Sequence, residues 1–347
     1  MELAARLARA AGDLVREGRP DRVVVAATKS SPVDPVTAMD RASEALLREA
    51  LGRLRPDDAI LGEEDDFHPG TSGLTWVLDP IDGTVNYLYG IPAYAVSVAV
   101  VAGGPDPATW TAVAGCVHAV TDGRTWTAGR GLGAFLDGRR LSVNAARPLA
   151  DCLVGTGFAY TLQRRTEQGR LVAEVLPRVR DIRRIGSAAL DLCSIATGSL
   201  DLYYERGLRP WDHAAGGLVA MESGAVVTGL HGAAAGEQMT VAGPAASVAD
   251  LVALLEAHGA ARGAWARLAP TRRRNSAPAP EPEPRPGSAC DVRLISLACI
   301  RRKNGAQSHR LGNISGQLRI EHPGPRPQYD TECDQTDGNR LRRPAQD

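Results

Sequence analysis

The sequence predicts an α+β / α/β protein made of two structured parts and a tail. In the first part, short apolar runs alternate with turn residues, which is typical of an antiparallel sheet. In the second part, strand-like and helix-like segments alternate, which is typical of an α/β layer. After Pro270 the chain is rich in proline and arginine and lacks apolar periodicity, so residues 269–347 are predicted to be a disordered tail.

The first part, residues 1–145, is predicted to be an N-terminal α+β subdomain. Apolar residues recur at helical spacing over residues 3–15, so an amphipathic helix should open the chain. A strand is expected at residues 23–25, and Thr37 can cap a second helix that ends before Pro56. The strands of the sheet are expected at residues 59–61, 76–78, 94–102, 111–119 and 124–128.

The second part, residues 146–268, is predicted to be a C-terminal α/β subdomain. Its strands are expected at residues 152–155, 182–185, 202–205, 225–228 and 239–241. Its helices are expected in a segment ending at Val175 and at residues 188–197, 211–221 and 248–257. We expect the two subdomains to share one cleft.

The formal net charge of zero hides an asymmetry along the chain. Residues 1–270 carry 26 basic and 31 acidic side chains, whereas residues 271–347 carry 14 and 9. The tail could be an arm for nucleic acid, but its charge is diluted by acids and it lacks interleaved aromatic residues. No nucleic-acid partner is therefore expected. Lys29 and Lys303 are the only lysines among 40 basic residues, which makes Lys29 noteworthy.

The cysteines and the apolar runs bear on the compartment. The six cysteines show no metal-ligand spacing, and Cys116, Cys152 and Cys193 lie singly in apolar segments, as reduced buried thiols do. No charged-then-apolar leader opens the chain, and no apolar run approaches transmembrane length. The expected location is the cytoplasm, without a membrane partner.

The most informative motif is WVLDPIDGTVNY at residues 76–87. An apolar strand ends in two carboxylates, Asp79 and Asp82, with the rigid Pro80 between them. Crowded carboxylates need a cation, and hard oxygen ligands favour Mg²⁺, Mn²⁺ or Ca²⁺. The Gly83-Thr84 pair precedes a segment that can be helical, and backbone N–H groups at a helix start favour a phosphate. This combination indicates metal-assisted phosphoryl chemistry.

Three further acidic motifs have ordinary explanations when each is taken alone. DPVTAMD at residues 34–40 could be helix capping, and GEEDD at residues 62–66 could be a solvated loop. In WDHAAGG at residues 211–217, Asp212 could cap a helix and His213 could serve packing. The occurrence of all four motifs in this order favours a common site.

The residues of these motifs and their order resemble those of the inositol monophosphatase family of metal-dependent phosphatases, over roughly residues 1–265. The resemblance implies a layered αβαβα sandwich of the inositol monophosphatase / fructose-1,6-bisphosphatase type, and a homodimer. It implies about two or three Mg²⁺ ions, with Mn²⁺ as an alternative. Their ligands would be Glu63, Asp79, the Ile81 carbonyl, Asp82 and Asp212, with Asp79 bridging two ions and Glu64 supporting them through water.

The resemblance also assigns catalytic and phosphate-binding roles. Asp40, Thr84 and Glu63 are implied as catalytic residues, with Asp40 holding the Thr84 hydroxyl so that the pair orients the attacking water. The N–H groups of Gly83 and Thr84 would bind the phosphate, because glycine allows a close approach. No covalent phosphoenzyme is needed.

The alcohol part of the substrate is expected to meet a second group of residues. By resemblance these are Gly186, Ser187, Ala188 and Glu205, together with the ligands Asp82 and Asp212. Glu205 could accept hydrogen bonds from sugar or inositol hydroxyls, or could be an exposed acid at a strand end. Arg183 and Arg184 are predicted to cover the surface rather than to meet a second anionic group.

The resulting hypothesis is a Mg²⁺-dependent phosphate monoester hydrolase acting on inositol monophosphate or a similar small phosphorylated polyol through a metal-activated water. Alternatives in the same superfamily are a histidinol-phosphatase, a fructose-1,6-bisphosphatase and a 3′-phosphoadenosine nucleotide phosphatase. A regulatory pseudoenzyme that binds Mg²⁺ or anions, and a nucleic-acid scaffold centred on the basic tail, are alternatives from other classes. The presence of every expected ligand argues against the pseudoenzyme.

Overall fold

The computed structural model describes residues 1–29, 35–104 and 106–260. Asp34, the end of the predicted second subdomain and the predicted tail at residues 269–347 lie outside the described residues.

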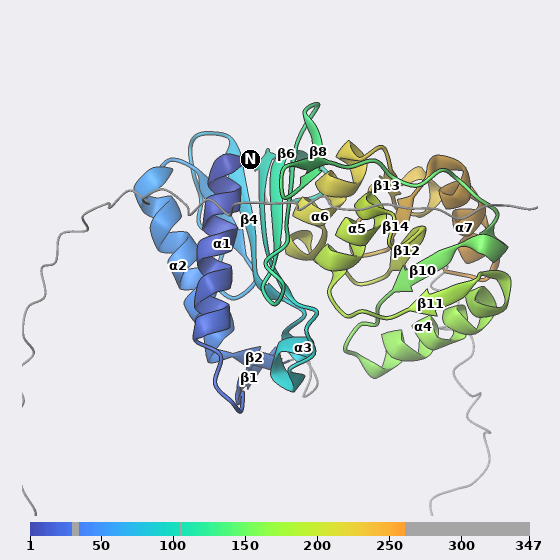
Figure 1. Ribbon diagram of the computed structural model, residues 1–347, viewed down its shortest axis with the longest axis horizontal. Helices are drawn as coiled ribbons and strands as arrows, with labels where there is room; N and C mark the ends of the chain where they lie inside the picture. The colour runs from blue at the N-terminus through green and yellow to red at the C-terminus, as the bar shows by residue number, and fades with distance from the viewer. Residues whose placement is uncertain (30–34, 105, 261–347) are drawn as a thin grey trace, which may run out of the picture. The chain divides into compact units, whose positions relative to one another are not determined.

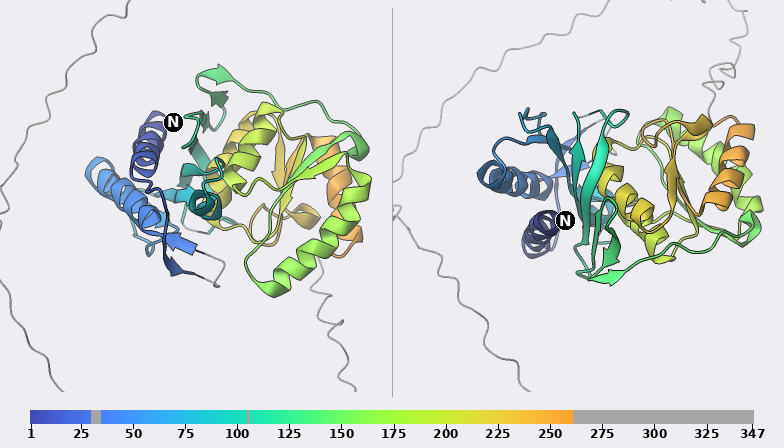
Figure 2. Two further views of the ribbon diagram at one scale, coloured as in Figure 1. Left: turned by 60° about the horizontal axis from the view of Figure 1, so that its bottom comes forward. Right: turned by 90° about the horizontal axis from the view of Figure 1, so that it is seen from above.

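The described chain folds into alternating layers of helix and sheet (Figures 1 and 2). Helices α1 (Glu2–Glu17) and α2 (Ala38–Leu54) cover one face of a seven-stranded sheet. Helices α5 (Ala188–Thr197) and α6 (Pro210–Glu222) lie between this sheet and a five-stranded sheet. Helices α4 (Leu162–Val175) and α7 (Ala245–Ala257) cover the far face. The expected αβαβα sandwich is confirmed.

The first sheet is mostly antiparallel, as the alternating apolar pattern predicts. Its strand order is β3-β4-β5-β6-β7-β8-β9, and only the β3–β4 pair is parallel. The strands are β3 (Ala59–Gly62), β4 (Leu74–Asp82), β5 (Ala95–Ala102), β6 (Thr111–Ala119), β7 (Thr125–Gly129), β8 (Gly133–Leu136) and β9 (Arg139–Arg140). A short helix, α3 (Thr84–Tyr89), follows β4 directly.

The second sheet is mixed and has the order β11-β10-β12-β14-β13. Strand β10 runs parallel to both its neighbours, whereas β14 pairs antiparallel with β12 and β13. The strands are β10 (Leu153–Thr156), β11 (Asp181–Arg183), β12 (Leu202–Glu205), β13 (Val226–Thr228) and β14 (Thr240–Gly243). The 3₁₀ turns are η1 (Leu149–Asp151), η2 (Leu176–Arg178) and η3 (Leu230–Gly232).

Some predicted boundaries are wrong. The strand expected at residues 23–25 is instead β1 (Val25–Thr28), because pairing with β2 (Pro35–Thr37) begins only at Val25. Strand β4 continues past Leu78 to Asp82, since pairing with β5 resumes after an irregularity. Helix α7 begins at Ala245, three residues before the expected start.

Small residues in α6 allow the middle helices to pack closely. A Cβ at Gly216 would lie 2.9 Å from the Leu192 Cβ of α5, and one at Gly115 of β6 would lie 3.0 Å from the Ala215 Cα. Close packing of this kind fixes the relative positions of neighbouring layers. The start of α6 is therefore held at a defined place beside the first sheet.

The cysteines and the lengths of the apolar helices were both the subject of sequence-based expectations. Cys116, Cys152 and Cys193 are free and buried, as predicted. Within residues 1–29, 35–104 and 106–260, no helix is both long and apolar enough to span a bilayer.

Candidate metal-binding active site

An irregular end of β4 brings two carboxylates toward the same side of the sheet. Asp79 pairs with Ser97 and Asp82 with Ala95, so β4 contains one more residue than β5 over this stretch. In a regular strand, residues three apart point to opposite faces of the sheet. The extra residue shifts this alternation by one, so that Asp79 and Asp82 point to the same face. Pro80 has no N–H to donate to the ladder, and its carbonyl accepts a bond of 3.1 Å from the Ser43 hydroxyl. The proline and the bulge together determine the positions of the two carboxylates.

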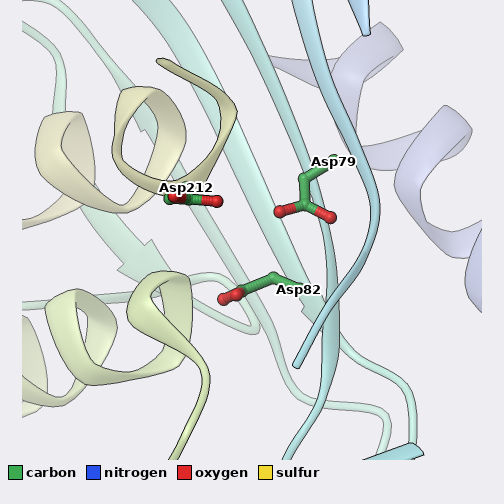
Figure 3. A group of neighbouring side chains, drawn as sticks. All are labelled: Asp79, Asp82 and Asp212. Atoms are coloured by element: carbon green, nitrogen blue, oxygen red, sulfur yellow. The ribbon is translucent and has the colours of Figure 1, made fainter. Parts of the chain in front are cut away.

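Asp212 joins this pair from a distant part of the chain. One carboxylate oxygen each from Asp79, Asp82 and Asp212 lies within 4.8 Å of the others, and the three side chains face one another in Figure 3. Asp212 lies in the first turn of α6, where its Oδ2 accepts a bond of 2.6 Å from the Arg209 N–H. Asp212 is therefore not the N-cap of α6, because Arg209 occupies that position.

Burial and mutual repulsion make this cluster unfavourable without a cation. Burial raises the pKa of Asp79 well above its usual value, and the charges of Glu63, Asp82 and Asp212 raise it further. Burial raises the pKa of Asp82 to about 6 and also raises that of Asp212. Crowded carboxylate oxygens are the donors that Mg²⁺ prefers. The residues present thus fit a hard divalent cation.

Glu63, another predicted ligand, forms an ion pair with a lysine. The Lys29 Nζ is 2.7 Å from the Glu63 Oε1 and 2.5 Å from the Glu64 Oε1. Burial raises the pKa of Glu63 to about 7, although Lys29 opposes this shift. Sequence reasoning did not place Lys29 in the site; its rarity in an arginine-rich chain was the available signal.

The backbone after β4 forms a corner suited to an anion. Gly83, with φ of +94°, is the N-cap of α3, and a Cβ there would lie 2.9 Å from the Ala93 carbonyl oxygen. The position therefore favours glycine on both conformational and steric grounds. The Thr84 Oγ1 lies 3.0 Å from both the Asp40 Oδ1 and the Ile81 carbonyl oxygen. A hydroxyl carries one proton, so it donates to only one of these acceptors at a time.

Asp40 serves helix capping and also reaches the site. Thr37 is the N-cap of α2, as predicted, and the Asp40 Oδ2 completes a capping box by accepting a bond of 2.8 Å from the Thr37 N–H and a short bond from its hydroxyl. The other Asp40 oxygen faces Thr84. Burial raises the Asp40 pKa, and its hydrogen bonds to Thr37 and Thr84 oppose the increase.

The start of α5 holds Asp82 from the other side. Ser187, the N-cap of α5, donates a bond of 2.5 Å to the Asp82 Oδ2, and the Ala189 N–H donates one of 2.7 Å to the same oxygen. At the end of β12, the Tyr203 hydroxyl donates a bond of 2.7 Å to the Glu205 Oε2. Burial raises the pKa of Glu205 to about 7.

A cavity of about 440 Å³ joins these groups. Of the predicted residues, its walls include Glu63, Asp79, Ile81, Asp82, Gly83, Thr84, Gly186, Ala188, Glu205 and Asp212. Asp40, Glu64 and Ser187 lie behind the wall, in contact with residues that form it.

Both arginines lie on the surface as predicted, but one of them also lines the cavity. Arg183 pairs with Asp181 at 2.5 Å on the surface, as expected. Arg184 lines the cavity, where its charge lowers the pKa values of Asp82 and Glu205 against the effect of burial. Arg184 is thus exposed, as predicted, and in addition belongs to the cavity wall.

Comparisons with known proteins give a consistent result. The model of the "Inositol monophosphatase family" matches residues 1–265. The "Inositol-1-monophosphatase SuhB" of Mycobacterium tuberculosis is 48% identical over 251 residues, which cover 70% of this chain and 84% of that protein. The "Nus factor SuhB" of Salmonella typhimurium is 37% identical over 234 residues, covering 67% and 85%. The solved structure "Mycobacterium tuberculosis SuhB" matches with a TM-score of 0.63 and 43% identity, over 75% of this chain and 96% of that one.

Proposed function

The chain belongs to the inositol monophosphatase family, and we propose that it is a Mg²⁺-dependent hydrolase of inositol monophosphate or a similar polyol phosphate. One observation carries the proposal: Asp79, Asp82 and Asp212, from two different layers, converge on one cavity beside Gly83 and Thr84. This arrangement combines cation ligands with an anion-binding corner.

In the proposed site, about two or three Mg²⁺ ions are held by the five predicted ligands: Glu63, Asp79, the Ile81 carbonyl, Asp82 and Asp212. When bound, such ions acidify the attacking water and stabilise the leaving oxygen. Glu64 supports Glu63 from behind, where both carboxylates share Lys29.

Thr84 and Asp40 orient the attacking water in this proposal. An ionised Asp40 carboxylate can only accept hydrogen bonds, so the Thr84 hydroxyl donates one to it and keeps its lone pairs for a water molecule. The Gly83 and Thr84 N–H groups bind the phosphate at the start of α3. Glu63 contributes to catalysis by binding the cation.

The alcohol part of the substrate lies toward Glu205 and Arg184. Glu205 accepts hydrogen bonds and the Arg184 guanidinium donates them, so a hydroxyl-rich alcohol can satisfy both. Gly186 and Ala188 form the adjoining wall at the start of α5, and Ser187 supports it from behind. This pairing of a donor with an acceptor favours a polyol over an alcohol that has no hydroxyl group besides the phosphorylated one.

The metal and phosphate groups do not separate this function from its three superfamily alternatives. Release of phosphate with Mg²⁺ should therefore be compared for inositol-1-phosphate, histidinol phosphate, fructose-1,6-bisphosphate and 3′-phosphoadenosine nucleotide. We expect the highest kcat/KM with inositol-1-phosphate. A preference for any other member of this panel would reassign the substrate, and no hydrolysis of any of them would favour the pseudoenzyme.

Replacing Asp79 by Asn tests the metal assignment. The change removes a charge at the centre of the cluster, so turnover should fall on the order of 1,000-fold while the circular dichroism spectrum is unchanged. Asp122→Asn, at an exposed turn, is the matched control and should retain full activity. A wild-type rate for the Asp79 variant would refute the assignment.

A cytoplasmic homodimer is proposed as the working state. The free, buried thiols of Cys116, Cys152 and Cys193 suit a reducing compartment. Light scattering on the purified protein would measure its mass in solution.

A further inference from the structure

A buried glutamate of α2 contacts the loop that carries Glu63. The Glu44 side chain is 0% exposed. Its Oε2 accepts a bond of 2.9 Å from the Glu64 N–H, and its Oε1 accepts one of 3.1 Å from the Asp65 N–H. The two residues immediately after Glu63 are therefore bonded to one carboxylate.

Arg48 fixes this carboxylate in turn. One turn along α2, its Nε donates a bond of 2.7 Å to the Glu44 Oε1, and its Nη2 donates one of 3.0 Å to the Asp65 carbonyl oxygen. A planar guanidinium with several donors suits this double contact. Arg48 thus connects the helix, the carboxylate and the loop.

Gly62, the residue immediately before Glu63, packs directly on the same carboxylate. A Cβ at position 62 would lie 2.1 Å from the Glu44 Oε1 and 2.4 Å from its Cδ. The loop can approach Glu44 so closely only because this residue has no side chain. Glu63 is consequently held on both sides, by a steric contact at Gly62 and by hydrogen bonds at Glu64 and Asp65.

The partners of the Glu44 carboxylate indicate that it positions the loop rather than only supporting the helix. Apart from the bond to Arg48, the hydrogen bonds of the Glu44 carboxylate go to loop N–H groups rather than to helix α2. A buried carboxylate is costly unless all its bonds are made. Any movement of the loop therefore carries an energetic cost.

We propose that Glu44, held by Arg48, is a positioning residue that sets the place of Glu63 for cation binding, an inference that rests on the proposed function. Lys29 acts on the Glu63 side chain, whereas Glu44 acts on the backbone around it. Groups that orient ligands from behind commonly change metal affinity when removed.

The test is the affinity of the purified protein for Mn²⁺, measured by calorimetry without substrate. Glu44→Gln keeps the shape but weakens the bonds to the loop, so the dissociation constant should rise about 10-fold. In the Mg²⁺ titration of activity, the half-saturating concentration should rise similarly while kcat at saturating Mg²⁺ stays within about twofold.

Glu49→Gln is the matched control. Glu49 lies on the same helix and pairs with Arg53 four residues on, but both side chains are about 70% exposed, so its Mn²⁺ affinity should be unchanged. Arg48→Gln leaves Glu44 in place but unfixed, and should weaken Mn²⁺ binding in the same direction. This variant supplies the result if Glu44→Gln does not fold.

Three outcomes can be distinguished. Weaker Mn²⁺ binding in the Glu44 or Arg48 variant, with the Glu49 control unchanged, supports the positioning role. A lower melting temperature with unchanged Mn²⁺ affinity overturns it, because Glu44 would then serve stability alone. If the wild-type protein binds Mn²⁺ but hydrolyses no phosphate ester, the proposed function fails, while the affinity comparison still decides the role of Glu44.

Discussion

Glu205 illustrates how burial can change the chemistry of one side chain. Its carboxyl lies beside the cavity, accepts a bond from the Tyr203 hydroxyl, and has its pKa raised to about 7 by burial. A Cβ at Gly157 would lie 1.9 Å from the Glu205 Oε2, so the carboxyl sits directly against the backbone just after β10. An acid so placed changes its charge near neutral pH.

The expected consequence is a pH-dependent KM. Lowering the pH from 8 to 6 protonates Glu205 and removes an acceptor, so KM for inositol-1-phosphate should rise. Glu205→Gln should have a KM raised about fivefold at pH 8, without that pH dependence. p-Nitrophenyl phosphate, which lacks the polyol, corrects for ionisation of the phosphate itself. An identical pH profile in the variant would count against the assignment.

At the scale of elements, the first turn of α5 links the middle helical layer to β4. The Ser187 hydroxyl and the Ala189 N–H both bond the Asp82 carboxylate, and the positive end of the helix favours its charge. The Asn86 side chain of α3 adds a bond of 2.9 Å to the Ile185 carbonyl oxygen just before this turn. The orientation of a proposed ligand therefore depends on where a neighbouring helix begins.

Ser187 is expected to contribute to both stability and metal binding. Ser187→Ala should lower the free energy of unfolding in urea by about 1–2 kcal/mol, because the cap and the bond to Asp82 are lost, and should weaken Mn²⁺ binding. Ser187→Thr keeps the hydroxyl and should retain both properties. Thr161→Ala removes the cap of α4, away from Asp82, and should lower stability alone. Unchanged Mn²⁺ affinity in Ser187→Ala would contradict this link.

At the scale of the whole molecule, the acidic cluster connects folding with cation binding. The folded-state pKa values of Glu63, about 7, and Glu205, about 7, exceed the usual 4.5. The folded state therefore binds more protons than the unfolded state in this range, and the free energy of unfolding falls as pH rises through 7. A cation that binds only the folded state offsets this loss.

The melting temperature of the chelated protein should accordingly fall between pH 6.5 and pH 8. Added Mg²⁺ should raise it more at pH 8 than at pH 6.5, because more of the carboxylates are then ionised. The buried His213, whose pKa is lowered to about 4, affects stability mainly below this window. Equal stabilisation by Mg²⁺ at both pH values would argue against a cation at this cluster. Asp79→Asn should show a smaller Mg²⁺ effect.

Much of the fold was predictable because local signals are strong. Helix α5 and strand β12 have the predicted bounds, and Thr37 caps α2 as expected. The failures concern strand boundaries, which are set by the pairing partners. Strand β4 continues to Asp82 because it pairs with β5 across a bulge, and β1 begins only where it can pair with β2. The pairing partner of a strand is not visible in its local pattern of residues.

The same division holds for the site. Residue types and near neighbours were enough to predict the acidic motifs and their order, the Thr37 cap of α2 and the close backbone approach at Gly83. The folded chain alone shows that Asp212 faces Asp79 and Asp82, that Lys29 joins Glu63 to Glu64, and that Glu44 holds their loop. Such contacts join residues up to 133 positions apart, Asp79 and Asp212 being the widest pair. Their geometry follows from how the layers pack.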